Sequence, residues 1–333
     1  MRSESIQQLF FQHIKGNLPG HISIADDIAE LLNISTDSAY RRIRGEKLIS
    51  LEEAAQLCAH YKFSLDQFLN LPSDSFLFSG KIKSSSKTPF EDYLENVLTN
   101  FTFFNSFKHK HLSVLMKDIQ PFVHFQIPEL ALFKYYFWMK SILDYEDMKN
   151  VKFSFDDTRY DGFKGISKKI IDGYNKIPMT EIWNAESINS TLRQINFYHE
   201  SGSFKNKHDV KLLYTKTIEL IDHLERQAEL GRKFNIGEEP GAHSAEYRLF
   251  VNELILGDNT YLAELDGNRL TFLNHSVLYF VATKDEQFNN AMFENMQNLI
   301  KKSTQISVIG EKERVKFFNR IREEIHQKQS ALQ

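Results

Sequence analysis

The sequence has 333 residues, of which 41% are hydrophobic, 13% aromatic and 26% charged. This composition is typical of a globular protein and excludes a disordered or fibrous chain. Because single hydrophobic cores stop growing near about 250 to 300 residues, the length predicts two or three domains. The 41 Lys and Arg residues against 44 Asp and Glu residues give a net charge of −3, which argues mildly against a protein that coats nucleic acid.

Cysteine content and hydropathy indicate the compartment. Cys58 is the one cysteine, which excludes an intramolecular disulfide framework and a multi-cysteine zinc site and fits a reducing environment. Residues 1–20 are interrupted by charged and amide side chains and lack the apolar core of a signal peptide. No stretch approaches the roughly 18 uninterrupted apolar residues of a membrane span. We expect a soluble cytoplasmic protein with no membrane partner.

Residues 1–72 are predicted to form a domain of short helices. Ser23, Ser35, Ser50 and Ser64 each stand just before an apolar run, where a hydroxyl can cap a helix. Ser50 and Glu53 also have the spacing of a capping box. The apolar positions at helical spacing are Ile6, Leu9, Phe10 and Ile14, then Ala25, Ile28, Ala29 and Leu32, and later Leu51, Ala54, Ala55 and Cys58.

The composition changes at residues 73–89, which are rich in serine and lysine and are predicted to be a linker. Its apolar part, residues 76–78, is expected to pack on a neighbouring surface. Residues 90–236 show helical spacing and many aromatic side chains, which predicts a helical region for dimerisation or sensing. The aromatic residues fit either a large core with a dimer surface or an aromatic-lined ligand pocket.

After residue 237 the spacing becomes extended. Strands are predicted at 247–256, 260–265 and 269–273, joined by turns at 257–259 and at Asp266-Gly267, so that they form an antiparallel meander. Helices are predicted at 285–302 and 311–328. Residues 237–333 therefore predict an α+β domain with a small antiparallel sheet and possible ligand sensing. The chain as a whole is predicted to be mainly α.

The most informative segment is 24–45, which reads IADDIAELLNISTDSAYRRIRG. Two helices that cross closely need a small residue in the first helix, a tight turn and an apolar residue after the turn. Ala29 supplies the small residue, Asn33 the turn and Ile34 the apolar anchor. Asparagine tolerates a left-handed backbone better than other non-glycine residues. Ser35 is expected to cap the second helix, whose inner face includes Ala39.

Residues 23–69 resemble the lambda repressor and Cro type of helix-turn-helix domain, the Xre-like family. The resemblance implies that the helix after the turn, residues 35–44, enters the major groove of DNA. It assigns Thr36, Asp37, Tyr40 and Arg41 to base edges. Asn33 departs from the commoner glycine, and Arg42 stands where the family usually has a buried apolar side chain.

Local charge supports the same segment. Residues 40–47 carry Arg41, Arg42, Arg44 and Lys47 against Glu46, so positive charge is concentrated on one helix of an otherwise acidic chain. We assign Arg42, Arg44 and Lys47 to phosphates, together with the hydroxyls of Ser23 and Ser38. Arg41 is the first choice for a forked contact with guanine.

The sequence thus predicts a dimeric, sequence-specific DNA-binding transcriptional regulator, with double-stranded DNA as partner and a small-molecule effector as a further candidate partner. One alternative is a protein-interaction scaffold that docks a partner on the helix-turn-helix surface. Another is an enzyme hidden in the C-terminal region, although we find no catalytic or metal-binding spacing and expect no cofactor. Residues 181–186, with Arg193, Tyr198 and His199, and the strands of residues 247–279 are the two candidate ligand-binding blocks.

Overall fold

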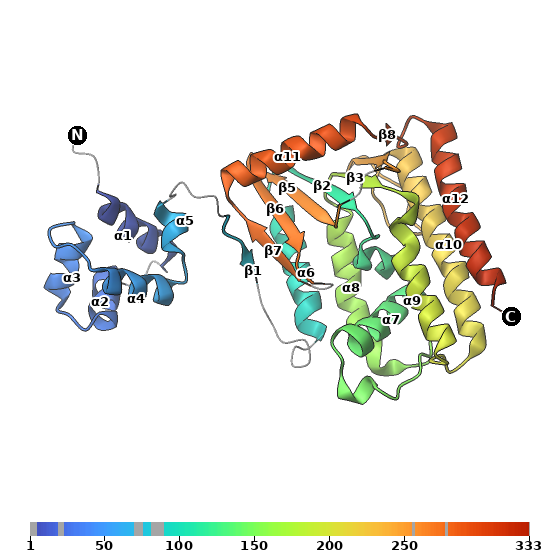
Figure 1. Ribbon diagram of the computed structural model, residues 1–333, viewed down its shortest axis with the longest axis horizontal. Helices are drawn as coiled ribbons and strands as arrows, with labels where there is room; N and C mark the ends of the chain where they lie inside the picture. Colours follow the sequence, from blue (N-terminus) through green and yellow to red (C-terminus); the bar gives the residue numbers. More distant parts are fainter. Residues whose placement is uncertain are drawn as a thin grey trace. The chain divides into compact units, whose positions relative to one another are not determined.

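The computed structural model describes residues 5–18, 23–69, 76–80, 90–254, 257–276 and 279–332, without the side chains of Asn17 and Gln67. The chain forms two compact units, Met1–Leu77 and Phe78–Gln333. We call them the helical unit and the sheet unit (Figure 1). Among the described residues, no helix is both long enough and apolar enough to cross a membrane.

The described part of the helical unit consists of short helices with side-chain caps. They are α1 (Ile6–Asn17), α2 (Ile24–Leu31), α3 (Thr36–Ile43), α4 (Leu51–Tyr61) and α5 (Leu65–Leu69). The hydroxyls of Ser23, Ser35 and Ser50 accept backbone N–H groups at the starts of α2, α3 and α4, which confirms these three caps. The capping box of Ser50 and Glu53 is also confirmed.

The core of the helical unit is formed by Phe10, Phe11, Ile14, Ile28, Ala29, Ala39 and Leu57. Two of the predicted apolar stripes are confirmed only in part, since Phe10, Ile14 and Ala54 are buried but other members of the stripes are exposed. Ile6 is 65% exposed and Leu51 is 80% exposed, whereas Phe11 and Leu57 are buried in their place. Apolar spacing over so few turns is compatible with more than one buried face, so spacing alone does not fix which face is buried.

The sheet unit contains one eight-stranded mixed sheet, with the order β1-β7-β6-β5-β2-β3-β4-β8. The central strands β2, β3 and β4 are parallel, and β5, β6 and β7 form an antiparallel meander beside β2. The strands are β1 (Ser79–Gly80), β2 (Lys110–Met116), β3 (Met179–Trp183), β4 (Tyr247–Val251), β5 (Thr260–Leu265), β6 (Asn268–Asn274), β7 (Phe280–Thr283) and β8 (Thr304–Gln305).

Helices cover both faces of this sheet. Val114 and Leu115 are neighbours on β2, yet they belong to different cores, because successive side chains of a strand point to opposite faces. The larger core also contains side chains from α6 (Phe90–Asn105), α7 (Pro128–Phe137), α8 (Asp161–Tyr174), α9 (Asn189–Glu200), α10 (Lys207–Leu230) and α12 (Glu311–Ser330). The smaller core lies under α11 (Glu286–Lys301), which packs Phe293 and Met296 on the other face (Figure 1).

The predicted fold class was therefore wrong for the sheet. We expected a small antiparallel sheet confined to residues 237–333, but β2 and β3 come from the region predicted to be helical, and the sheet is mixed. Every residue of β3 is buried. Parallel strands that are buried on both faces show no alternation of apolar and polar residues, so short apolar runs of this kind resemble helix segments in sequence.

The predicted meander was also wrong in its first strand. The strand predicted at 247–256 is β4, which pairs with β3 in parallel, whereas β2 and β3 lie between it and β5. Residues 255 and 256 lie outside the described residues. The strand at Thr260–Leu265 and the turn at Asp266-Gly267 are confirmed, since β5 and β6 pair across them.

Most of the predicted linker, residues 73–75 and 81–89, lies outside the described residues. Of the described part, Ser79 and Gly80 form β1 and pair with Ala282 and Val281 of β7. Phe78 contacts Phe288 of α11 edge to face, with ring centroids 5.2 Å apart. This end of the segment therefore belongs to the sheet unit.

Candidate nucleic-acid interface

The turn between α2 and α3 has the backbone that the sequence predicts. Asn33 adopts a left-handed conformation with φ of 52°. Its N–H donates to Glu30 O at 3.2 Å, and the N–H of Ile34 donates to Ala29 O at 3.0 Å. This pair of hydrogen bonds is the Schellman motif, which ends a helix and turns the chain sharply. The prediction for Asn33 is confirmed.

The inner face of α3 packs closely on the rest of the helical unit. Ala39 is fully buried and Ala29 is almost fully buried, so small side chains lie where α2 and α3 approach each other. Ser35 begins α3 by accepting the N–H of Ser38 at 3.2 Å. Near the same end, Thr36 Oγ1 donates to Asp26 Oδ1 of α2 at 3.4 Å. The cap and the packing together fix the rotation of α3.

This rotation leaves the four residues assigned to base edges on one exposed face. Thr36 and Tyr40 are one helical turn apart, as are Asp37 and Arg41, so all four side chains lie on adjacent rows of α3. Thr36 and Asp37 are exposed, Tyr40 is 48% exposed, and the Arg41 side chain is 53% exposed. The structure thus brings together the whole predicted base-contacting set.

Arg42 does not join this face, and its assignment to phosphate is withdrawn. Its side chain is 5% exposed and forms a two-pronged ion pair with Glu53 of α4, with Nη2 to Oε1 at 2.6 Å and Nε to Oε2 at 3.1 Å. Nη1 donates to the hydroxyl of Ser38 at 2.6 Å. The helical spacing that exposes Arg41 turns its neighbour inward. Glu53 neutralises the buried charge of Arg42.

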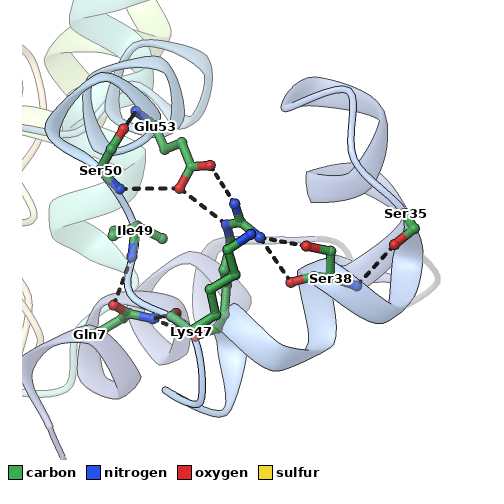
Figure 2. Close-up of polar contacts among 8 residues, drawn as sticks. Gln7, Ser35, Ser38, Lys47, Ile49, Ser50 and Glu53 are labelled. Carbon is green, nitrogen blue, oxygen red and sulfur yellow. Dashed lines mark hydrogen bonds and ion pairs between the residues drawn. The ribbon is translucent and has the colours of Figure 1, made fainter.

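Glu53 also ties this pair to the start of α4. Its Oε2 accepts the N–H of Ser50 at 3.1 Å, while the Ser50 hydroxyl accepts the N–H of Glu53 at 3.1 Å. Glu53 of α4 and Ser38 of α3 face each other across the network (Figure 2). Hydrogen bonding by the Arg42 guanidinium holds the pKa of the Glu53 carboxyl below its ordinary value. One carboxylate therefore locks α3 to α4.

Two side chains that the sequence analysis missed position the loop after α3. The amide nitrogen of Gln7 on α1 donates to the carbonyls of Arg42 at 2.7 Å and Lys47 at 2.8 Å, and its oxygen accepts the N–H of Ile49 at 3.1 Å (Figure 2). Gln8 donates to the carbonyl of Arg44 at 2.9 Å. These contacts span about 40 residues of chain and involve backbone atoms, so no sequence pattern reveals them.

The loop presents Arg44 and Lys47 beside the exposed face of α3. The side chain of Arg44 is 57% exposed, and Lys47 is also exposed. Glu46 lies 2.8 Å from Arg44 Nε and 3.9 Å from Arg41 Nε. Exposed ion pairs contribute about 0 to 1 kcal/mol, so a phosphate can displace Glu46 from either arginine at small cost. The exposed charges of this segment are therefore three cations and one carboxylate.

The two serines assigned to phosphates occupy different surroundings. Ser23 is exposed at the start of α2, where its oxygen accepts the N–H of Asp26 at 3.4 Å and its hydroxyl hydrogen stays available to donate. Ser38 is half-buried against Arg42, one helical turn before it on the same row of α3. Ser23 keeps the geometry that a phosphate contact needs, whereas Ser38 acts first as a partner of Arg42.

The first candidate block for a ligand in the sheet unit is part of the interior. Glu181 is fully buried and accepts from the Tyr174 hydroxyl at 2.7 Å, the Trp183 indole N–H at 2.9 Å and the Tyr247 hydroxyl at 2.7 Å. The buried ammonium of Lys233 lies 3.9 Å from the same carboxylate. The Glu181 carboxylate is thus hydrogen-bonded on both oxygens and paired with a buried cation, so this block belongs to the core of the sheet unit.

Comparison with known proteins adds no relative. The chain matches no family model, no curated protein and no solved structure. The interpretation of the helical unit therefore depends on its own geometry and on the sequence resemblance described above.

Proposed function

We propose that the protein is a sequence-specific DNA-binding transcriptional regulator that inserts α3 into the major groove. The observation that carries the proposal is the exposed face formed by Thr36, Asp37, Tyr40 and Arg41 on a helix held by a tight turn and a buried ion pair. A helix in the major groove reads bases with the side chains of one such face, while flanking basic side chains bind phosphates.

Each side chain of this face has a chemical role in the proposal. Arg41 forms the forked hydrogen bonds that recognise O6 and N7 of guanine. Asp37, one turn earlier on the same row, either accepts from a cytosine amino group or orients Arg41. Thr36 and Tyr40 add a hydroxyl and a ring that can contact a thymine methyl group. Arg44, Lys47 and Ser23 hold the backbone on either side.

A single helix offers few base contacts, so the proposal includes a homodimer that binds two half-sites. The half-sites would lie one helical turn apart, about 34 Å, as is usual when two recognition helices enter the same side of the duplex. The net charge of −3 fits a small footprint, because acidic surface outside the helix weakens indiscriminate binding.

The test is selection from a random duplex library by the full-length protein, followed by a mobility-shift assay with the selected duplex. We expect enrichment of a two-fold symmetric sequence, and binding that Arg41→Ala weakens by about 5- to 150-fold, the equivalent of about 1 to 3 kcal/mol. Lys15→Ala removes a positive charge from α1 of the same unit and is the matched control, with little change expected. A library that yields no enriched sequence, with equal weak binding by all variants, would refute the proposal.

The protein-interaction scaffold stays a second candidate because of two apolar side chains next to the basic loop. Leu48 is 79% exposed and Leu51 is 80% exposed, and protein interfaces combine apolar anchors with arginine. If this alternative holds, Leu48→Ser with Leu51→Ser abolishes co-purification of a partner protein, and the selected library shows no enrichment. If the regulator proposal holds, the enriched DNA is recovered and Arg41→Ala is the damaging change.

A further inference from the structure

The sheet unit has a pocket of about 400 Å³ at the carboxyl ends of its central parallel strands. Residues 117–122, which follow β2, line one side, and Ser187 to Gln194, which follow β3, contribute to another. The neighbour of β2 on one side is parallel β3, and on the other it is antiparallel β5. In sheets of this kind, ligands bind beyond the carboxyl ends of the parallel strands, and the volume falls within the usual range for small-molecule sites.

Lys134 of α7 lines this pocket and has no negatively charged partner in the ion pairs of the described residues. Its side chain is almost fully buried. Nζ donates to Thr191 Oγ1 at 2.9 Å and to Gln194 Oε1 at 2.7 Å, both neutral groups. Burial lowers the pKa of the Lys134 ammonium to about 7, and the nearby Asp118 opposes this shift. A buried cation without a counter-charge is unfavourable, so an anion at this position would stabilise it.

The side chains behind Lys134 orient it without neutralising it. His124 is fully buried, and its Nδ1 lies 3.1 Å from Pro121 O and 3.3 Å from Gln120 O. We assign the proton to this nitrogen, because a carbonyl can only accept. Nε2 of His124 then accepts from the Thr191 hydroxyl at 3.0 Å, which leaves the Thr191 oxygen to accept from Lys134. Burial and the neighbouring ammonium lower the pKa of His124 well below its ordinary value, so the ring is neutral.

The rest of the pocket wall is largely aromatic. The wall is formed by side chains of α6, of α7 and the residue that follows it, and of the meander, namely Tyr93, Phe137, Trp138, Tyr261 and Phe280. A second, smaller cavity shares Gln120, Phe122, Tyr261 and Phe280 with this wall, and its other lining is mainly apolar and includes Phe101, Phe104 and Phe272. The region therefore offers apolar contacts to the body of a ligand and one cation to its head.

The charges at the rim favour a single negative charge on the ligand. Asp118 lines the pocket and already accepts from the Ser190 hydroxyl. Lys117 is paired with Asp258 at 2.7 Å, and both side chains are exposed. A dianion such as a phosphate monoester would lie near Asp118 with only one unpaired buried cation to balance it, so a monoanionic carboxylate is the better match.

We propose that this pocket binds a small organic carboxylate, with the carboxylate on Lys134 and an apolar body against the aromatic wall. The inference is independent of DNA binding by the helical unit, since it concerns only residues of the sheet unit. Trp138 lines the pocket, so ligand binding should also change tryptophan fluorescence.

The test compares carboxylates with neutral molecules of the same shape. Phenylacetate and hexanoate, with phenylacetamide and hexanamide as their neutral counterparts, are titrated into the full-length protein slightly below neutral pH, in a buffer free of carboxylates, by calorimetry. At least one carboxylate should bind with one site per chain and about tenfold or more tightly than its amide, a difference of about 1.4 kcal/mol. Lys134→Met should remove this preference, because methionine fills similar volume without the charge.

Lys149→Met is the matched control, since Lys149 is exposed, pairs with Glu146 and lies outside the lining of this pocket. It should keep the preference. If Lys134→Met does not fold, Lys134→Gln tests the same point with a polar side chain. The proposal is overturned if neither carboxylate binds better than its amide, or if the preference persists without Lys134. If Lys134→Met still binds DNA, failure of the carboxylate proposal can be distinguished from failure of the regulator proposal.

Discussion

Glu53→Ala should destabilise the helical unit strongly and leave the sheet unit unchanged. The substitution removes the carboxylate that contacts Arg42. Among the described residues it leaves the guanidinium, whose side chain is 5% exposed, with the two oxygens of Ser38 as its partners. Breaking a buried ion pair costs about 3 to 5 kcal/mol. Because the Glu53 side chain is 22% exposed, water reaches this site in part, and we expect the lower end, about 3 kcal/mol.

In a unit of this size, about 3 kcal/mol lowers the melting temperature by roughly 12 to 24 °C. The matched control is Glu52→Ala, which removes an exposed carboxylate from the same first turn of α4. Its effect should stay within about 0.5 kcal/mol. Arg42→Met combined with Glu53→Met should recover most of the lost stability, because an apolar pair replaces a buried ion pair at little cost.

Hydrogen exchange of the backbone amides of α3 and α4 in the full-length protein measures this effect. Trp138 and Trp183 both lie in the sheet unit and are the only tryptophans, so tryptophan fluorescence during thermal unfolding follows the sheet unit alone and serves as the internal control. The reasoning fails if Glu53→Ala exchanges no faster than Glu52→Ala, or if the fluorescence transition shifts by a similar amount.

Three further predictions follow from the same structure. The Arg42 guanidinium lowers the pKa of Glu53, so the ion pair stabilises the helical unit fully above the unfolded-state pKa of about 4.3. This stabilisation is lost as the pH falls through the lower folded-state pKa. Amide exchange of α3 should show the resulting acid destabilisation in the wild type and not in Glu53→Gln. Asn33→Ala should lower the stability of the helical unit by about 1 kcal/mol, because φ of Asn33 is positive, whereas Asn33→Gly should leave stability unchanged; both are measured by amide exchange. Equal effects of the two substitutions would contradict a left-handed turn at Asn33. Because an anion binds the protonated form of Lys134, whose pKa is about 7, carboxylate affinity by calorimetry should fall toward about tenfold per pH unit above that value. The control is His275→Gln, which removes an imidazole that also lines the pocket and keeps the charges of Lys117, Asp118 and Asp258. The same fall should persist in this variant, and an affinity that does not change with pH would contradict the assignment.

The local signals in the sequence were reliable where one residue decides the conformation. The serine caps at Ser23, Ser35 and Ser50, the capping box at Ser50 and the left-handed turn at Asn33 depend on side chains and backbone within four positions, so they can be read from the sequence, and these are confirmed. The exposed face of α3 follows from the same short-range spacing once Ala39 is known to be buried.

The features that the sequence did not reveal depend on distant partners. β2 and β3 are buried between layers of helices, so they show no alternation that separates them from helix segments. Arg42 was assigned to phosphate with the other basic residues, because charge alone does not show that Glu53 would lie against it. Lys134 likewise lies within a run of aromatic residues, and nothing in that run predicts the pocket that Lys134 lines.

The central claim is that Arg41 on α3 recognises a base while Lys47 binds a phosphate. The salt dependence of DNA affinity distinguishes these two roles. The affinity of the selected duplex for the full-length protein is measured between about 50 and 200 mM salt, the range over which phosphate contacts dominate the change in affinity. We predict that Arg41→Ala loses most of the preference for the selected duplex over a scrambled one, whereas Lys47→Ala weakens both duplexes and reduces the salt slope by about 1. Absence of salt-sensitive DNA binding by the wild type, or an unchanged preference in Arg41→Ala, would contradict the claim.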